Sequence, residues 1–234
     1  MKVQQLKNYG KGFANSTLDP EKVKQMERVI SQELRGELGI IAVMNLMWKM
    51  RKKIRQMKKF QWSKLRERGF TDQRFLDDLI ERTALIRVLV DMVGIQRASE
   101  IHRKILDKIA YEFMASMFPS VEALKACGDP FKSFKEYFKA FNTANERAGI
   151  HEVKIVEDTD DVFAFNVEYC IWHEVAKEFG DPYLCYPSTC YGDEVFFPRM
   201  CAHAGFCFRR NGTLATGAPV CDFGFERPAG GNNN

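Results

Sequence analysis

Hydrophobic positions in the first part of the chain recur at the spacing of an α-helix. A helix is predicted to begin at Asp19 and Pro20, because proline is favoured in the first helical turn. Apolar residues follow three or four positions apart in two runs, first Val23, Met26, Ile30 and Leu34, then Met47, Met50, Ile54 and Met57. Two more helices are predicted, one capped by Thr71 and ending near Gly94, the other running from Ser99 to the residues before Pro119.

A last helix of this part is predicted after Asp129 and Pro130, and it is rich in aromatic residues. One face of it carries Phe131, Phe134, Tyr137, Phe138 and Phe141. Such a face is typical of core packing, although it could also form the wall of an apolar pocket.

Near Gly149 the hydrophobic period changes from that of a helix to that of a strand. Residues 151–157 and 162–169 alternate and predict two strands joined by an acidic turn at residues 158–161. Residues 171–179 predict a short helix closed by Gly180. A strand is predicted over residues 200–208, then a type I′ hairpin turn at Asn211 and Gly212, a returning strand over 213–216, and a final strand over 220–226.

Helices followed by an antiparallel sheet with one inserted helix indicate an α+β fold. We expect a helical segment over residues 1–148 that packs on one face of the sheet, and an α+β segment over residues 149–227 that carries the active site. The polar, glycine-rich residues 228–234 are expected to be a disordered tail. The two segments are expected to form one folded unit.

Composition adds limits on location and partners. The chain has 234 residues, 45% hydrophobic and 28% charged, with a net charge of +4. The first sixteen residues contain no apolar core of a signal peptide, and the longest apolar stretch is too short to span a bilayer, so a cytoplasmic location is expected. The basic run over residues 49–59 could face nucleic acid or an anionic membrane. A solvated helix face is the preferred interpretation, with no nucleic-acid or membrane partner.

Cysteines are concentrated in the second part of the chain. Six of the seven lie between residues 170 and 221, namely Cys170, Cys185, Cys190, Cys201, Cys207 and Cys221. In a chain without a signal peptide, reduced thiols used for catalysis or metal binding are favoured over disulfides. The alternative for any one of them is a small buried hydrophobic residue.

Four short stretches are candidates for chemistry, and three of them place thiols beside carboxylates. They are FNVEYC ending at Cys170 with Glu174 after it, Cys190 to Asp193, the glycine-rich residues 212–217, and Cys221 with Asp222. A thiolate is a good nucleophile once its pKa is lowered, and a carboxylate can bind an amidinium or take a proton from water. If Asp193 and Glu174 lie close together in an apolar pocket, raised pKa values are expected for these carboxyls.

The ordered co-occurrence of these motifs over roughly residues 160–226 resembles the L-2-amino-thiazoline-4-carboxylic acid hydrolase family. The resemblance implies a hydrolase that acts on a carbon–nitrogen or carbon–sulfur bond of a small heterocycle. The named member opens the ring of 2-amino-thiazoline-4-carboxylate to give an N-carbamoyl cysteine. As candidate site residues the resemblance points to Cys170, Glu174, Cys190, Asp193, Cys221 and Asp222.

Two mechanisms and one non-catalytic role stay open. In the first, Cys221 or Cys190 attacks the amidine-like carbon, no cofactor is required, and backbone amides near Gly212 or Gly217 stabilise the developing charge. In the second, Zn²⁺ activates water, held by thiolates of Cys170, Cys190 and Cys221, with His173 or His203 as substitutes. The third is a module that binds a small molecule or senses oxidants through paired thiols. Cys185, Cys201 and Cys207 have no assigned role, and a homo-oligomer is compatible with the sequence.

Overall fold

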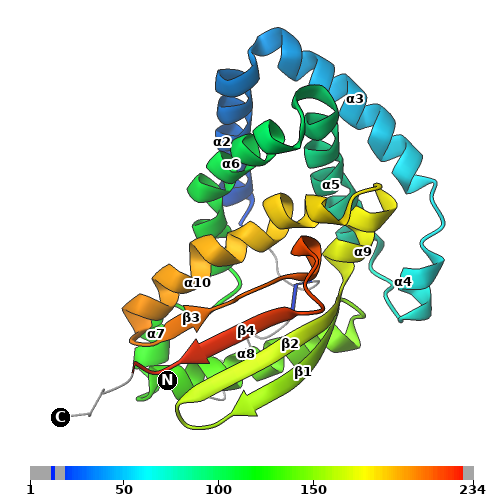
Figure 1. Ribbon diagram of the computed structural model, residues 1–234. Coiled ribbons are helices and arrows are strands. Elements are labelled where there is room, and N and C mark those ends of the chain that lie inside the picture. Colours follow the sequence, from blue (N-terminus) through cyan, green and yellow to red (C-terminus); the bar gives the residue numbers. More distant parts are fainter. Residues whose placement is uncertain (1–11, 14–18, 229–234) are drawn as a thin grey trace.

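The computed structural model describes residues 12–13 and 19–228 (Figure 1). Helices dominate the described part of the chain up to residue 147. They are α2 (Pro20–Leu38), α3 (Ile40–Lys58), α4 (Ser63–Glu67), α5 (Gln73–Val93), α6 (Ile95–Ala115), α7 (Val121–Lys125) and α8 (Pro130–Arg147). The predicted helical character of this part is confirmed.

Side-chain caps explain where several of these helices begin. The carboxylates of Asp19 and Asp129 accept hydrogen bonds from the first-turn amides of α2 and α8, as the aspartate–proline pairs predicted. For α5 the cap is Asp72, which accepts from the Phe75 amide at 2.9 Å, and not Thr71. Helix α6 begins at Ile95, directly after Gly94 with its positive φ of 80°, and therefore four residues before Ser99.

The second part of the chain contains a four-stranded antiparallel sheet. Its strands are β1 (His151–Asp158), β2 (Val162–Cys170), β3 (Cys207–Arg209) and β4 (Cys221–Glu226), in the order β1-β2-β4-β3. Between β2 and β3 lie α9 (Ile171–Glu178), the single turns η1 (Pro182–Leu184) and η2 (Tyr186–Cys190), and α10 (Tyr191–Ala204). The α+β class is confirmed, with helices first and an antiparallel sheet after them.

Three local predictions in this part are wrong. Most of the strand predicted over residues 200–208 is the end of helix α10, and only Cys207–Arg209 is extended. Asn211 and Gly212 do not form a type I′ turn, since neither has the positive φ that this turn requires. In place of the returning strand there is a short 3₁₀ turn, η3 (Leu214–Thr216), capped by the Thr213 hydroxyl.

Aromatic side chains form the contact between helices and sheet. Phe225 of β4 is fully buried, and its ring packs against Phe134 and Phe138 of α8 and against Phe197 of α10. Figure 1 shows α8 behind the sheet and α10 running above β3. The aromatic face predicted for α8 is therefore part of the core.

Core contacts also join the helical part to the inserted segment, since Tyr111 of α6 packs on Phe196 of α10. The division of the chain near residue 148 stays a prediction. Of the predicted tail, only Pro228 lies within the described residues. None of the helices in the described ranges combines the length and the apolar character needed to cross a bilayer.

Candidate active site

Four thiols from three parts of the chain gather where β2 ends. Cys170 is the last residue of β2 and directly precedes α9. Cys185 directly precedes the π-helical turn η2 and Cys190 ends it, with their sulfur atoms 3.6 Å apart. Cys221 begins β4, opposite Val167 of β2. We call Cys170, Cys185, Cys190 and Cys221 the sulfur cluster, and all four are at least nine-tenths buried.

Cys170 is the member of the cluster that its surroundings favour as a thiolate. The adjacent Cys185 thiol holds the pKa of Cys170 well below its usual range against the effect of burial, and His151 and the backbone of His173 add to this. Cys170, Cys190 and burial raise the pKa of Cys185. Because only Cys170 has the imidazole and the positive end of α9 beside it, we assign the negative charge to Cys170.

Cys221 has the opposite environment. Burial raises the pKa of the Cys221 thiol well above its usual range, and the nearby Cys170 and Cys190 raise it further. The amide of Leu214 donates a hydrogen bond to Cys221 Sγ at 3.2 Å, but this single donor does not offset burial. Cys221 is therefore a protonated thiol at neutral pH.

A buried arginine links the sulfur cluster to two carboxylates at the start of α10. The Arg210 side chain is only 3% exposed, and its guanidinium contacts Asp193 Oδ2 at 2.7 Å, Glu194 Oε1 at 2.9 Å and the Cys190 carbonyl at 2.8 Å. Burial raises the pKa of Asp193, and the charge of Cys170 raises it further, while Arg210 and His151 act against this rise. Asp193 thus lies within electrostatic reach of both Cys170 and His151.

Two other candidate carboxylates have contacts of a different kind. Glu174 accepts a hydrogen bond from Lys177 at 2.7 Å and lies 3.7 Å from His173 Nδ1, so its polar contacts are with residues of α9 and not with Asp193. Asp222 accepts from the amides of Asn211 and Gly212 and from the Asn211 side chain. These contacts hold the loop between β3 and β4, so the role of Asp222 in them is structural.

Cys170, Cys190 and Cys221 lie in one cluster, but the predicted metal ligands are not placed to hold one ion together. Within the described ranges, no group of three or more histidine, cysteine, aspartate or glutamate side chains is placed to hold a metal ion. His203 lies at the other end of α10, about 20 Å along the helix from Cys190 at 1.5 Å per residue, where its Nδ1 lies 2.7 Å from the Arg199 carbonyl. His173 stays near the cluster, and burial lowers its pKa. The donor set therefore does not fit the proposed Zn²⁺.

The remaining thiols are separate from the cluster. Cys201 is fully buried within α10, and burial raises its pKa. Cys207 is exposed on β3. Of the three thiols without an assigned role, only Cys185 belongs to the site.

Comparison with known families decides the assignment. The sequence model of the L-2-amino-thiazoline-4-carboxylic acid hydrolase family matches residues 74–225. The chain belongs to this family. The match extends from α5 to β4, so it covers every residue of the sulfur cluster and also most of the helical part, where the motifs gave no sharp resemblance. No curated protein matches the chain.

The family's name points to a hydrolase acting on an aminothiazoline carboxylate.

Three residues of the site were absent from the sequence prediction: His151, Arg210 and Cys185. His151 faces Cys170 across β1 and β2. A strand ending at residue 157 and paired there with one beginning at residue 162, the predicted bounds, would instead put residue 151 opposite residue 168. The observed pair nearest the turn is Asp158 with Phe163, and this shift of two positions places the histidine beside the thiol.

Proposed function

We propose that this member of the family opens the ring of a small cyclic amidine such as 2-amino-thiazoline-4-carboxylate, with Cys170 as the nucleophile. The observation that carries the proposal is the environment of Cys170. Among the four clustered thiols it is the most exposed, at 9%, and its pKa is held low by Cys185 and His151. This assignment differs from the sequence-based preference for Cys221 or Cys190, because the raised pKa of Cys221 disfavours its thiolate.

In the first half of the reaction, the Cys170 thiolate attacks the amidine carbon between the ring sulfur and nitrogen. The bond from that carbon to the ring sulfur breaks, and the leaving sulfur takes a proton from the imidazolium of His151. The product of this half is an isothiourea that joins the substrate carbon to Cys170 Sγ, with a free thiol on the opened ring.

In the second half, neutral His151 takes a proton from water, and the resulting hydroxide adds to the isothiourea carbon. The bond to Cys170 Sγ then breaks, which returns the thiolate and the imidazolium and releases an N-carbamoyl thiol. One water is consumed, and no electrons are exchanged. Asp193, within electrostatic reach of Cys170 and His151, is suited to hold the amidinium nitrogens during both halves.

The test is turnover of 2-amino-thiazoline-4-carboxylate by purified full-length protein, followed by release of a new thiol and by mass spectrometry of the product. Cys170→Ser is expected to lose nearly all activity, because a serine hydroxyl is a far poorer nucleophile. The matched control Cys207→Ser changes an exposed thiol outside the sulfur cluster and should keep wild-type activity. Retention of most activity by Cys170→Ser would remove Cys170 from the role of nucleophile.

One observation favours a second function. Cys185 Sγ and Cys190 Sγ are 3.6 Å apart, which suits a pair of thiols that oxidants convert to a disulfide. In that case the chain would be a sensor without turnover. A protein that binds the thiazoline, gains thermal stability from it and yields no product would favour the sensor over the hydrolase.

A further inference from the structure

Helix α3 presents its largest apolar side chains to solvent. Ile40, Ile41, Met44, Met47 and Trp48 are all exposed, and the fractions reach 85% for Ile41 and 63% for Trp48. They lie at the corner where α2 meets α3, at the top of Figure 1 and far from the sheet. Single exposed apolar residues are ordinary on a protein surface, whereas five within nine positions mark a contact surface.

Basic residues continue the same outward face toward the end of α3. At 100° per residue, Arg51, Lys52, Arg55 and Lys59 fall in line with Ile41, Met44 and Trp48, on the side opposite the buried Leu46 and Met57. The sequence contains no acidic residue between positions 38 and 66. Among the described residues, Arg51, Lys52 and Arg55 have no ion-pair partner, whereas Lys58 on the inner side pairs with Asp77 at 3.0 Å.

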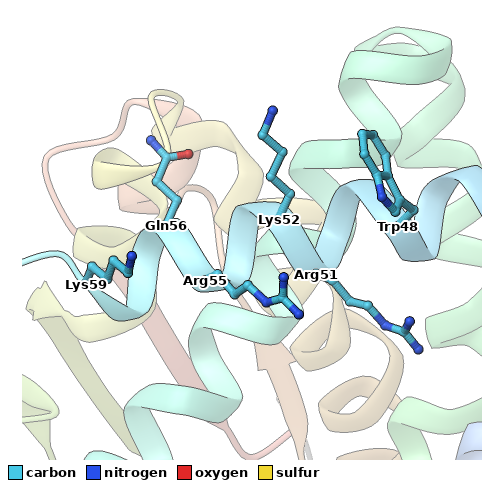
Figure 2. A pocket seen from close by; sticks show the side chains of 6 residues that line it. All are labelled: Trp48, Arg51, Lys52, Arg55, Gln56 and Lys59. Atoms are coloured by element: carbon cyan, nitrogen blue, oxygen red, sulfur yellow. The ribbon is translucent and has the colours of Figure 1, made fainter.

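A shallow hollow lies where the apolar and basic parts of this face meet. It has a volume of about 680 Å³ and is lined by side chains of α3 and the residue after it, namely Trp48, Arg51, Lys52, Arg55, Gln56 and Lys59. Figure 2 shows all six side chains leaving the same stretch of chain, with Trp48 at one end and Lys59 at the other. Four of the six are cations, so the hollow is suited to an anionic group.

We propose that α3 docks this chain on the surface of an anionic lipid bilayer. The order of residues along the helix matches the order of layers at such a surface: Ile40, Ile41, Met44 and Met47 for the acyl boundary, Trp48 for the interface, and the cations for the headgroups.

Other occupants of this face fit less well. A second copy of the chain would set the unpaired cations of α3 against the same cations, which repel each other. Nucleic acid would match the charge but leave the five apolar side chains exposed. Helix α3 lies before the residues that match the family, and it contributes no residue to the sulfur cluster. The proposal departs from the expectation of a merely solvated helix face.

Binding of the full chain to vesicles tests the proposal, with phosphatidylcholine alone compared with equal amounts of phosphatidylcholine and phosphatidylserine. Trp48 is a built-in reporter, because Trp62 and Trp172 are each only 8% exposed. We expect cosedimentation and a blue shift of the tryptophan emission with the mixed vesicles, both weakened by added salt. The blue shift is expected to disappear in Trp48→Phe.

Two paired substitutions separate the parts of the surface. Each basic residue near an anionic surface contributes about a fivefold factor in partitioning, corresponding to about 1 kcal/mol. The double variant Lys52→Glu, Arg55→Glu is therefore expected to bind at least about 25-fold more weakly. Ile41→Ser with Met44→Ser is expected to lose about tenfold or more through its apolar contacts. The matched control, Lys132→Glu with Lys154→Glu, changes two exposed lysines of α8 and β1 and should bind within about twofold of wild type.

Absence of wild-type binding to the mixed vesicles would overturn the proposal, as would an equal loss of binding in the control variant. Sedimentation velocity supplies a further check. A wild-type dimer that Ile41→Ser with Met44→Ser converts to monomer would show that a second copy covers α3 and would also overturn the proposal.

Discussion

Replacing Arg210 by methionine tests the buried ion network beside the sulfur cluster. The Arg210 guanidinium is almost fully enclosed and contacts Asp193, Glu194 and the Cys190 carbonyl. Methionine keeps much of the aliphatic volume but removes the charge and all three hydrogen bonds. The variant therefore isolates what the guanidinium contributes to the free energy of unfolding.

The expected cost is about 3 kcal/mol. Breaking a buried ion pair by removing one partner costs about 3–5 kcal/mol, because the other charge is left without compensation. The Asp193 side chain is 22% exposed and can be partly relieved by water or protonation, which places the cost at the lower end of this range. Glu194 is 39% exposed, so its pair with Arg210 adds less than about 1 kcal/mol.

The assay is urea unfolding at neutral pH, with Arg209→Met as the matched control. Arg209 pairs with Glu226 at 3.2 Å, but both side chains are at least 42% exposed, so its loss should cost less than about 1 kcal/mol. A double-mutant cycle of Arg210→Met with Asp193→Asn should show a coupling of at least about 1 kcal/mol. Equal costs for the Arg210 and Arg209 variants, with no coupling, would refute the reasoning.

Three further outcomes are expected. Asp222→Ala should lower the free energy of unfolding by about 2 kcal/mol at neutral pH and speed hydrogen exchange of the Gly212 amide. The N–H donors lower the pKa of Asp222 despite its burial, so the stability that its carboxylate contributes should be lost as the pH falls through that lowered pKa. The unfolding free energies of wild type and variant should therefore converge in acid. Phe225→Ala should cost about 3–5 kcal/mol in urea unfolding, because Phe225 is fully buried, whereas a loss below about 1 kcal/mol would contradict its place in the core. Dialysis against a chelator should leave thiazoline turnover unchanged, and loss of activity restored by Zn²⁺ would favour the metal mechanism instead.

The sequence predicted the elements whose signals are local. The aspartate–proline starts of α2 and α8 need only a cap and a fixed φ, and both helices begin where these pairs stand. Strand β2 alternates because one of its faces packs on the aromatic side of α8, where Phe165 contacts Phe138. The gathering of Cys170, Cys190 and Cys221 was also predicted, and the structure brings these three thiols together.

Elements that depend on distant partners were missed. Helix α10 lies between α6 and the sheet and buries Phe196 and Phe197 side by side, so its sequence lacks a one-sided helical pattern. The Asn211-Gly212 pair is a strong hairpin signal, but the carboxylate of Asp222, ten residues away from Gly212, holds both amides in an extended loop. The pairing of His151 with Cys170 depends on the register of β1 and β2, which differs by two residues from the register that the predicted strand ends imply.

The central claim is that Cys170 is the reactive thiolate of the sulfur cluster. Brief alkylation with iodoacetamide over a range of pH, followed by peptide mapping, measures this directly for all seven cysteines. We expect Cys170 to be alkylated fastest at pH values below the usual range of a thiol pKa, and to be protected by 2-amino-thiazoline-4-carboxylate. Preferential labelling of Cys221 or Cys190 in that range would contradict the claim.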